Sequence, residues 1–177
     1  MANNLSEILK KKQAALAQTF RELPAIIGEE VVNFTLENFE KQGWQGDSLD
    51  PWEKRKNPNA WGQKDDTGRA LLVKTGKLKR SIRIASIQAD KVTIAVGGAD
   101  VPYARVHNEG FKGTINQQVK EHIRRGKNFK NIKVSAFKRT IQQNIPKRQF
   151  IGSEEQSPIL KERIKKLCLD EIKKAMK

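Results

Sequence analysis

The sequence has few of the residues from which most redox, metal and catalytic sites are built. Its 177 residues include one cysteine, Cys168, and two histidines, His107 and His122. A single cysteine forms no disulfide within the chain and cannot supply a cysteine-based zinc site. No apolar stretch approaches the ~18–20 residues needed to cross a bilayer, and we expect no secretory signal. We therefore predict no metal, no cofactor and no membrane partner.

Hydrophobic residues are also scarce. They make up 37% of the chain, below the globular average of roughly 45–50%. Positive charge is in excess, because 35 Lys and Arg against 20 Asp and Glu leave a net charge of +15. The length predicts a single domain over residues 1–177. Its small core predicts that much of the surface stays exposed or is buried only against other chains.

The motifs of common enzymes are missing. The chain contains no glycine-rich phosphate loop, no Gly-x-Ser-x-Gly and no paired histidines near a carboxylate. His107-Asn108-Glu109 is superficially nuclease-like, but the second histidine is lacking, so we expect His107 to be hydrogen-bonded at a sheet edge. Glu171-Ile172-Lys173 has the Glu-x-Lys form of metal nucleases, yet it lies in a Lys-rich helical segment where such triplets arise by chance. We predict no enzymatic activity and no small-molecule substrate.

The first third of the chain changes from a helical to a loop pattern. Residues 1–42 are predicted to be a helical N-terminal segment. Within it, apolar residues recur at three- and four-residue steps through residues 4–42. Pro24 interrupts the pattern, so we expect two helices or one kinked helix, with Gly43 as the C-terminal cap. Residues 43–70 are predicted to be a loop. Its tryptophans either anchor the loop on the core or line a partner surface; they are Trp44, Trp52 and Trp61.

The remainder of the chain combines strands with a last helix. Residues 71–112 are predicted to hold the sheet core, with an antiparallel hairpin over 81–97 and a turn at Thr75-Gly76-Lys77-Leu78 before it. Residues 113–143 are predicted to form a long hairpin arm, because two loosely similar segments flank a turn-like Gly126-Lys127-Asn128; a helix over 117–125 is the competing prediction. Residues 144–177 end in a helix that begins at Ser157-Pro158. The fold class is therefore α+β.

The positive charge is concentrated in the hairpin arm and the residues beside it. Residues 111–148 carry 11 basic side chains and one acidic side chain, Glu121. Such a segment attracts polyanions, but it could also stay solvated or dock on an acidic face of a neighbouring subunit. The arm itself holds only two aromatics, Phe129 and Phe137, which do not support a base-stacking surface. The candidate DNA or partner contacts are Lys120, Arg124, Arg125, Lys127, Lys130, Lys133, Lys138 and Arg139.

Three segments resemble motifs of the phage virion morphogenesis proteins, also called tail-completion proteins. Residues 71–82 resemble the family's Leu-x-x-Thr-Gly-x-Leu-x-x-Ser-Ile, and residues 103–110 resemble its Tyr-Ala-x-x-His-x-x-Gly. Residues 146–152 are similar to Pro-x-Arg-x-Phe-Leu-Gly, although Gln149 stands where the family often has proline. The corresponding candidate structural or interface residues are Thr75, Gly76, Leu78, Ser81, Tyr103, His107, Gly110, Arg148, Phe150 and Gly152.

These motifs also make physical sense. Gly76 permits a positive φ in a tight turn, and Tyr103 and His107 fall on one side of a helical turn, from which they can pack and hydrogen-bond against the sheet. Arg148 presents a planar cation that suits a carboxylate, within the chain or on a neighbouring subunit.

The resemblance implies a structural protein of a tailed bacteriophage or prophage that completes the tail or joins it to the head. Related proteins work as rings, commonly hexamers, around the DNA channel. The implied partners are other tail or neck proteins, copies of the chain itself and, non-specifically, DNA. The implied location is the bacterial host cytoplasm during assembly and then the virion.

Two other functions remain in competition. The alternative is a basic, sequence-independent nucleic-acid-binding protein, which predicts tight, salt-dependent DNA binding by the free chain. A toxin-like nuclease is disfavoured by the missing catalytic motifs.

Overall fold

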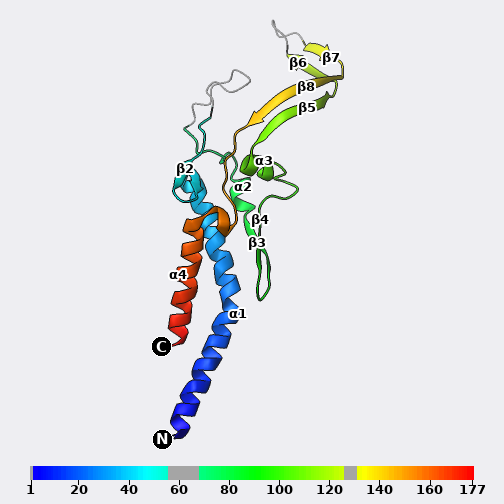
Figure 1. Ribbon diagram of the computed structural model, residues 1–177. Coiled ribbons are helices and arrows are strands. Elements are labelled where there is room, and N and C mark those ends of the chain that lie inside the picture. Colours follow the sequence, from blue (N-terminus) through cyan, green and yellow to red (C-terminus); the bar gives the residue numbers. More distant parts are fainter. Residues whose placement is uncertain (1, 56–67, 126–130) are drawn as a thin grey trace.

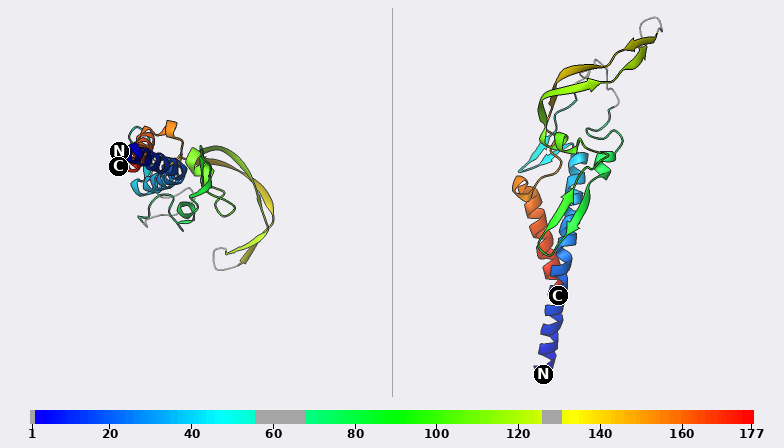
Figure 2. Two further views of the ribbon diagram at one scale, coloured as in Figure 1. Left: turned by 90° about the horizontal axis from the view of Figure 1, so that it is seen from below. Right: turned by 90° about the vertical axis from the view of Figure 1, so that its right-hand side faces the viewer.

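The computed structural model describes residues 2–55, 68–125 and 131–177. Two helices, α1 (Ala2–Lys41) and α4 (Pro158–Ala175), lie side by side and antiparallel, so that both chain termini point toward one end (Figures 1 and 2). A two-stranded ribbon projects from the opposite end of the molecule. Helices and antiparallel strands are combined in one chain, which confirms the predicted α+β class.

Helix α1 is one continuous helix of 40 residues with Pro24 inside it, so the two-helix alternative is wrong. Proline removes only one backbone hydrogen bond, and the flanking turns pack on the rest of the protein. The predicted cap at Gly43 is also wrong, because the left-handed residue after the helix is Gln42, with φ 53°. The Gln42 side chain donates to the carbonyl of Phe39 and accepts from the amide of Leu71, which stabilises this unusual backbone.

The segment after α1 is more ordered than the predicted loop. Strands β1 (Gly43–Gln45) and β2 (Leu49–Pro51) form a short antiparallel pair. Trp44 is buried edge-on against Phe34, and Trp52 is buried edge-on against Phe39. These two tryptophans therefore anchor the segment on the core; Trp61 lies outside the described residues.

The predicted hairpin over 81–97 is confirmed. Strands β3 (Arg83–Ile87) and β4 (Val92–Ala95) pair antiparallel, with a bulge between Ile84 and Ser86. The hairpin lies on α1 where the helix carries Gly28. A Cβ at Gly28 would stand 2.9 Å from Cδ1 of Ile84 and 3.0 Å from Cγ1 of Val92. Glycine thus permits the close packing of helix and hairpin.

Two short helices flank this hairpin. Helix α2 (Lys77–Arg80) stands where a turn was predicted, and α3 (Ala104–Glu109) is the expected helical turn. Leu78 of α2 and Ala104 of α3 are buried in the main core, to which the C-terminal half of α1 contributes Phe39. The buried members of that core are Phe39, Trp52, Leu78, Ile82, Val101, Ala104 and Phe150. A second cluster of Phe34, Trp44 and Leu160 joins α1 to α4.

Helix α4 begins as predicted. The Oγ of Ser157 accepts a hydrogen bond from the amide of Leu160 at 3.0 Å, and Pro158 occupies the first turn. An apolar stripe along α4 is half-buried; it consists of Ile164, Leu167, Cys168 and Ile172.

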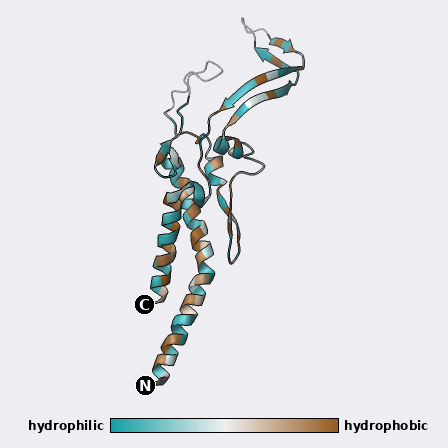
Figure 3. Ribbon diagram, viewed as in Figure 1, coloured by the Kyte–Doolittle hydropathy of each residue, from teal (hydrophilic) through white to brown (hydrophobic). Residues whose placement is uncertain are grey.

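The hairpin arm spans residues 111–145, two residues more at each end than predicted. Strands β5 (Phe111–Val119) and β8 (Phe137–Ile145) pair over nine positions, and β6 (His122–Arg125) pairs with β7 (Asn131–Val134) toward the tip. The competing helix over 117–125 is therefore wrong. The predicted turn at Gly126-Lys127-Asn128 lies outside the described residues. The arm curves away from the helices, and hydrophobic and hydrophilic residues alternate along it (Figures 2 and 3).

Candidate functional site

The three motif segments, far apart in the sequence, meet at one pocket of about 460 Å³ beside α2 and α3. Residues 71–78 form one wall, α3 and the residue before it form another, and Arg148 closes the site. The motif residues that line the pocket are Thr75, Gly76, Leu78, Tyr103, His107 and Arg148. Ser81, Gly110, Phe150 and Gly152 are not among its lining residues.

Arg148 is held rigidly in this pocket. Its side chain donates from Nε and Nη2 to the backbone carbonyl of Glu53, at 3.0 and 2.8 Å. Only 9% of the residue is exposed. Within the described residues it forms no ion pair, so the intramolecular carboxylate partner left open by the sequence is replaced by a carbonyl oxygen. Burial lowers the pKa of the Arg148 guanidinium; the charge of Glu53 opposes this shift and that of Arg55 adds to it.

His107 lies on α3 rather than at a sheet edge, so that expectation is wrong. Its ring stands edge-on to the ring of Tyr103, with 5.8 Å between centroids. Its Nδ1 is buried and has no hydrogen-bond partner among the described residues. Desolvation lowers the pKa of His107, and the charge of Arg148 lowers it further. The backbone carbonyl of His107 accepts from the amide of Arg148 at 2.8 Å, which couples α3 to the last motif.

The Thr75-Gly76 motif shapes the opposite wall. Gly76 has φ 72°, the left-handed conformation expected from the sequence. Arg80 reaches back over this turn and donates from Nη2 to the carbonyl of Thr75 at 2.9 Å. Ser81 serves the scaffold, because its Oγ donates to the carbonyl of Leu78 at 2.7 Å and accepts from the amide of Gly97 at 2.9 Å.

The last motif also serves the scaffold away from the pocket. Phe150 is a core residue in contact with Phe39, at 5.2 Å between centroids. Asn108 on α3, to which the sequence assigned no role, accepts from the amides of Phe150 and Ile151 at 3.0 and 3.1 Å. A Cβ at Gly152 would stand 2.7 Å from Nε2 of Gln149. These contacts fix the segment that carries Arg148.

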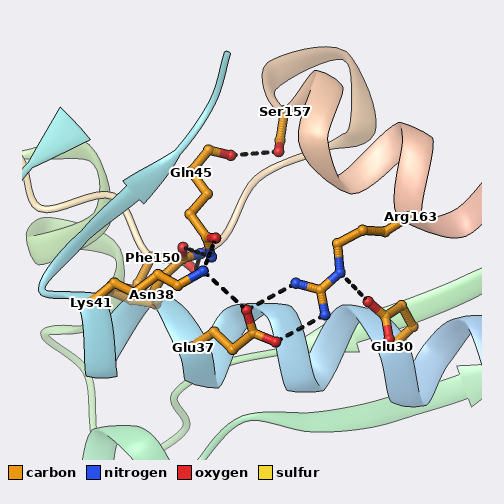
Figure 4. Close-up of polar contacts among 8 residues, drawn as sticks. All are labelled: Glu30, Glu37, Asn38, Lys41, Gln45, Phe150, Ser157 and Arg163. Carbon is orange, nitrogen blue, oxygen red and sulfur yellow. Dashed lines mark hydrogen bonds and ion pairs between the residues drawn. The ribbon is translucent and has the colours of Figure 1, made fainter. Parts of the chain in front are cut away.

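Further contacts join the same segment to the helix pair (Figure 4). Asn38 donates to the carbonyl of Phe150 at 3.1 Å and accepts from Nε2 of Gln45 at 3.0 Å. The backbone carbonyl of Gln45 accepts from Oγ of Ser157 at 2.5 Å. Arg163 on α4 then reaches two carboxylates of α1. Helices and pocket are therefore one connected structure.

The pocket also contains cations that the sequence did not single out. Lys74 and Lys77 flank the Thr75-Gly76 turn, and Arg55 and Arg69 come from either side of the undescribed residues 56–67. The two lysines could have been predicted as pocket residues, since they lie inside the first motif. The two arginines could not have been predicted as pocket residues, because the segment that contains them has no regular pattern.

The candidate DNA or partner contacts lie elsewhere, along the arm. Those described are exposed except for Arg139, which is half-buried and donates from Nε to Oε1 of Gln117 at 2.8 Å. Lys133 pairs with Glu121 at 3.5 Å. Lys127 and Lys130 lie outside the described residues. The pocket and the basic tip of the arm are thus separate features.

Nearly the whole chain matches one known family. The model of the phage virion morphogenesis family covers residues 2–171. The chain belongs to this family. No curated protein and no solved structure gives a significant match.

Membership in the phage virion morphogenesis family gives the protein a role in phage assembly and confirms the family that the sequence resemblance suggested. Two properties hold within residues 2–55, 68–125 and 131–177. None of the helices there is long and apolar enough to cross a membrane. The same ranges contain no group of three or more His, Cys, Asp or Glu side chains that could hold a metal ion.

Proposed function

We propose that this family member completes the tail or joins it to the head, and that copies of it form a ring around the DNA channel through their arms. The observation that carries the proposal is an apolar face on the arm. Opposed residues of an antiparallel pair share a face, and the register of β5 and β8 puts three apolar pairs on one of them. These pairs are Phe111 with Ile145, Ile115 with Ile141, and Val119 with Phe137.

The other face of the arm is entirely polar. Its pairs are Lys112 with Asn144, Thr114 with Gln142, Asn116 with Thr140, and Gln118 with Lys138. Two of them are linked by side-chain hydrogen bonds, at 3.1 Å for Thr114 with Gln142 and 3.0 Å for Thr140 with Asn116. The arm is therefore amphipathic: one face is entirely polar, and on the other the three apolar pairs alternate with the pairs Gly113 with Gln143 and Gln117 with Arg139.

The apolar face is only partly covered in the single chain, where Val119, Ile141 and Ile145 are half-buried. Phe111, Ile115 and Phe137 are 36%, 38% and 42% exposed, and no arm residue belongs to either core cluster among the described residues. An isolated two-stranded ribbon is at best marginally stable in water. Burial against a neighbouring subunit would stabilise the arm, and a head-to-tail contact repeated around an axis closes a ring.

Electron microscopy of phage lysates tests the assembly role. A phage that lacks this gene is expected to yield filled heads separated from tails, or tails of aberrant length. Intact, infectious particles would contradict the role.

A matched pair of variants tests the arm face. Ile141→Asn places an amide on the apolar face, and Gln142→Asn places the same side chain on the polar face one residue away. We expect the first variant to fold and to be lost from purified virions, and the second to be incorporated. Normal incorporation of Ile141→Asn would overturn the proposed arm contact. Circular dichroism of both purified proteins checks the fold.

The alternative of DNA binding as the main role is supported by the exposed cations near the tip, among them Lys120, Arg124 and Lys138. It predicts that the free protein binds duplex DNA tightly, with affinity falling steeply as salt rises. The assembly role predicts weak binding by the free chain. Titration of a labelled duplex at 50 and 200 mM salt separates the two.

A further inference from the structure

The pocket beside α2 and α3 combines a cationic rim with an apolar floor. Lys74 and Lys77 are exposed at the rim, and neither forms an ion pair within the described ranges. Leu71 and Leu72 are half-buried floor residues that pack on the main core. No carboxylate stands among the described lining residues. The pocket therefore offers positive charge and apolar surface together.

Arg148 is a positive charge held in one position in this pocket. Two of its nitrogens are bound to the carbonyl of Glu53, while Nη1 has no hydrogen-bond partner among the described residues and is not enclosed. A buried cation is costly unless it is paired. Because the guanidinium is already ordered, an anion that reaches Nη1 would gain a charge-assisted hydrogen bond without the entropic cost of ordering the side chain.

Two features of the pocket wall, the His107 side chain and the Leu72 backbone, support a binding role for the pocket. The Nδ1 of His107 is buried without a partner among the described residues, and the ring lines the same pocket. An unsatisfied buried polar atom carries a desolvation cost, which is retained here beside the pocket. Leu72 has φ 58°, which is rare for a residue with a bulky side chain. Strain of this kind is retained where the surrounding structure imposes it.

We propose that the pocket binds an acidic peptide segment of another assembly protein, with a carboxylate at Arg148, Lys74 and Lys77 and an adjacent apolar side chain on the floor of Leu71 and Leu72. This inference rests on the proposed function, since it supplies the partner chemistry of the assembly role. A peptide fits better than a DNA backbone, because phosphates and sugars have no apolar group to cover the two leucines. The planar guanidinium also matches a carboxylate.

The probe is a blocked, fluorescently labelled peptide, acetyl-Leu-Asp-Leu-Glu-amide, titrated with the full chain at 150 mM salt. Its uncharged analogue, with Asn and Gln, measures the part of the binding that does not need carboxylates. We expect the acidic peptide to bind at least ten-fold more tightly than the analogue. Equal affinity would overturn the proposal.

Two variants of equal charge locate the binding. The double variant Lys74→Gln, Lys77→Gln alters the rim, while Lys112→Gln, Lys138→Gln alters the polar face of the arm by the same two charges. We expect the rim variant to bind the peptide about ten-fold more weakly and the arm variant to bind as the parent does. An equal loss in both would show that only net charge attracts the peptide, and would overturn the site.

Arg148→Lys tests the guanidinium without removing its charge, and the shifts of the His107 ring in NMR spectra show whether the peptide enters the pocket. Displacement of the peptide by a short DNA duplex from the parent, but not from the rim variant, would assign the pocket to phosphate and overturn the carboxylate. The outcome is independent of the phage experiment. If deletion blocks assembly and the peptide does not bind, only the pocket proposal fails; if the peptide binds and virions form without the protein, the assembly role fails and with it the assembly partner, while the acidic-peptide site stands.

Discussion

Arg163 on α4 binds the carboxylate of Glu37 on α1 through two parallel hydrogen bonds of 2.9 Å. The same guanidinium donates from Nε to Glu30 at 2.6 Å and lies over the ring of Phe34, 5.4 Å from its centroid. Glu30, Phe34 and Glu37 recur at steps of four and three residues and so share one face of α1. One side chain thus joins α4 to two turns of α1 (Figure 4).

The first prediction concerns this contact. Glu37→Gln should lower the free energy of unfolding by about 1 kcal/mol, because it removes one half of a bidentate, charge-assisted pair that is about one-third exposed. Urea denaturation measures the change. Glu109→Gln is the control, since Glu109 pairs with Arg105 in an exposed i,i+4 contact, and its loss should cost within about 0.5 kcal/mol. Equal effects would show that the helix pair does not depend on Arg163.

The second prediction concerns Gly110, between α3 and β5. Its φ of 78° and ψ of 168° lie in a region open essentially to glycine alone. An added Cβ would also stand 3.0 Å from the amide nitrogen of Lys147. Gly110→Ala should therefore destabilise the protein by about 2–3 kcal/mol, measured by thermal unfolding. Gly46→Ala, where the nearest atom would be Nε1 of Trp44 at 3.4 Å, should change stability little; a similar loss at both sites would refute the backbone argument.

The third prediction separates the arm from the core. Replacing residues 113–143 by an Asn-Gly turn should leave a folded protein with a cooperative transition, because neither core cluster contains a described arm residue. The same protein should fail to enter virions. Loss of cooperative unfolding would show that the arm belongs to the core. Removal of residues 158–177 is the contrast, since it takes away Leu160 and should abolish folding.

The fourth prediction is a pH dependence at His107. Desolvation and the charge of Arg148 lower the pKa of this histidine in the folded state, so the unfolded chain binds the proton more readily. Stability is then complete above the unfolded value of about 6.5 and falls as the pH drops from there toward the folded pKa. Tyr103 contacts the ring, and Lys74, Lys77 and Arg148 face the same pocket.

His107→Gln should remove this part of the pH dependence. The measurement is the free energy of unfolding at pH 7.5 and 5.5 for the parent and the variant, with His122→Gln on the exposed arm as the control. We expect a smaller difference between the two pH values in His107→Gln than in the parent or the control. An unchanged difference would show that His107 does not titrate differently on folding.

Local patterns in the sequence were enough to predict most secondary structure. The alternation over 81–97 predicted the first hairpin, two similar segments around a turn-like stretch predicted the arm, and Ser157-Pro158 marked the start of α4. These features depend on neighbours two to four residues apart, which a single sequence displays directly. The one-turn helix α2 and the strands β1 and β2 were missed, because three or four residues carry too little periodicity.

Long-range contacts explain the remaining differences. Gln42 takes the left-handed position after α1 because its side chain reaches Leu71, 29 residues away. Arg148 pairs with the carbonyl of Glu53, 95 residues away, where its planar cation had suggested a carboxylate. A backbone carbonyl is present at every residue, so no sequence pattern could have marked this one.

The sequence by itself determined the α+β class, the amphipathic helices, the basic hairpin arm and the family motifs, since each is expressed in local spacing and composition. Only the tertiary structure decided that six motif residues line one pocket while the others support it. It also showed that the arm exposes an apolar face outside the core. The physical reason is that burial and charge environment depend on which distant segments meet, and that depends on how the whole chain packs.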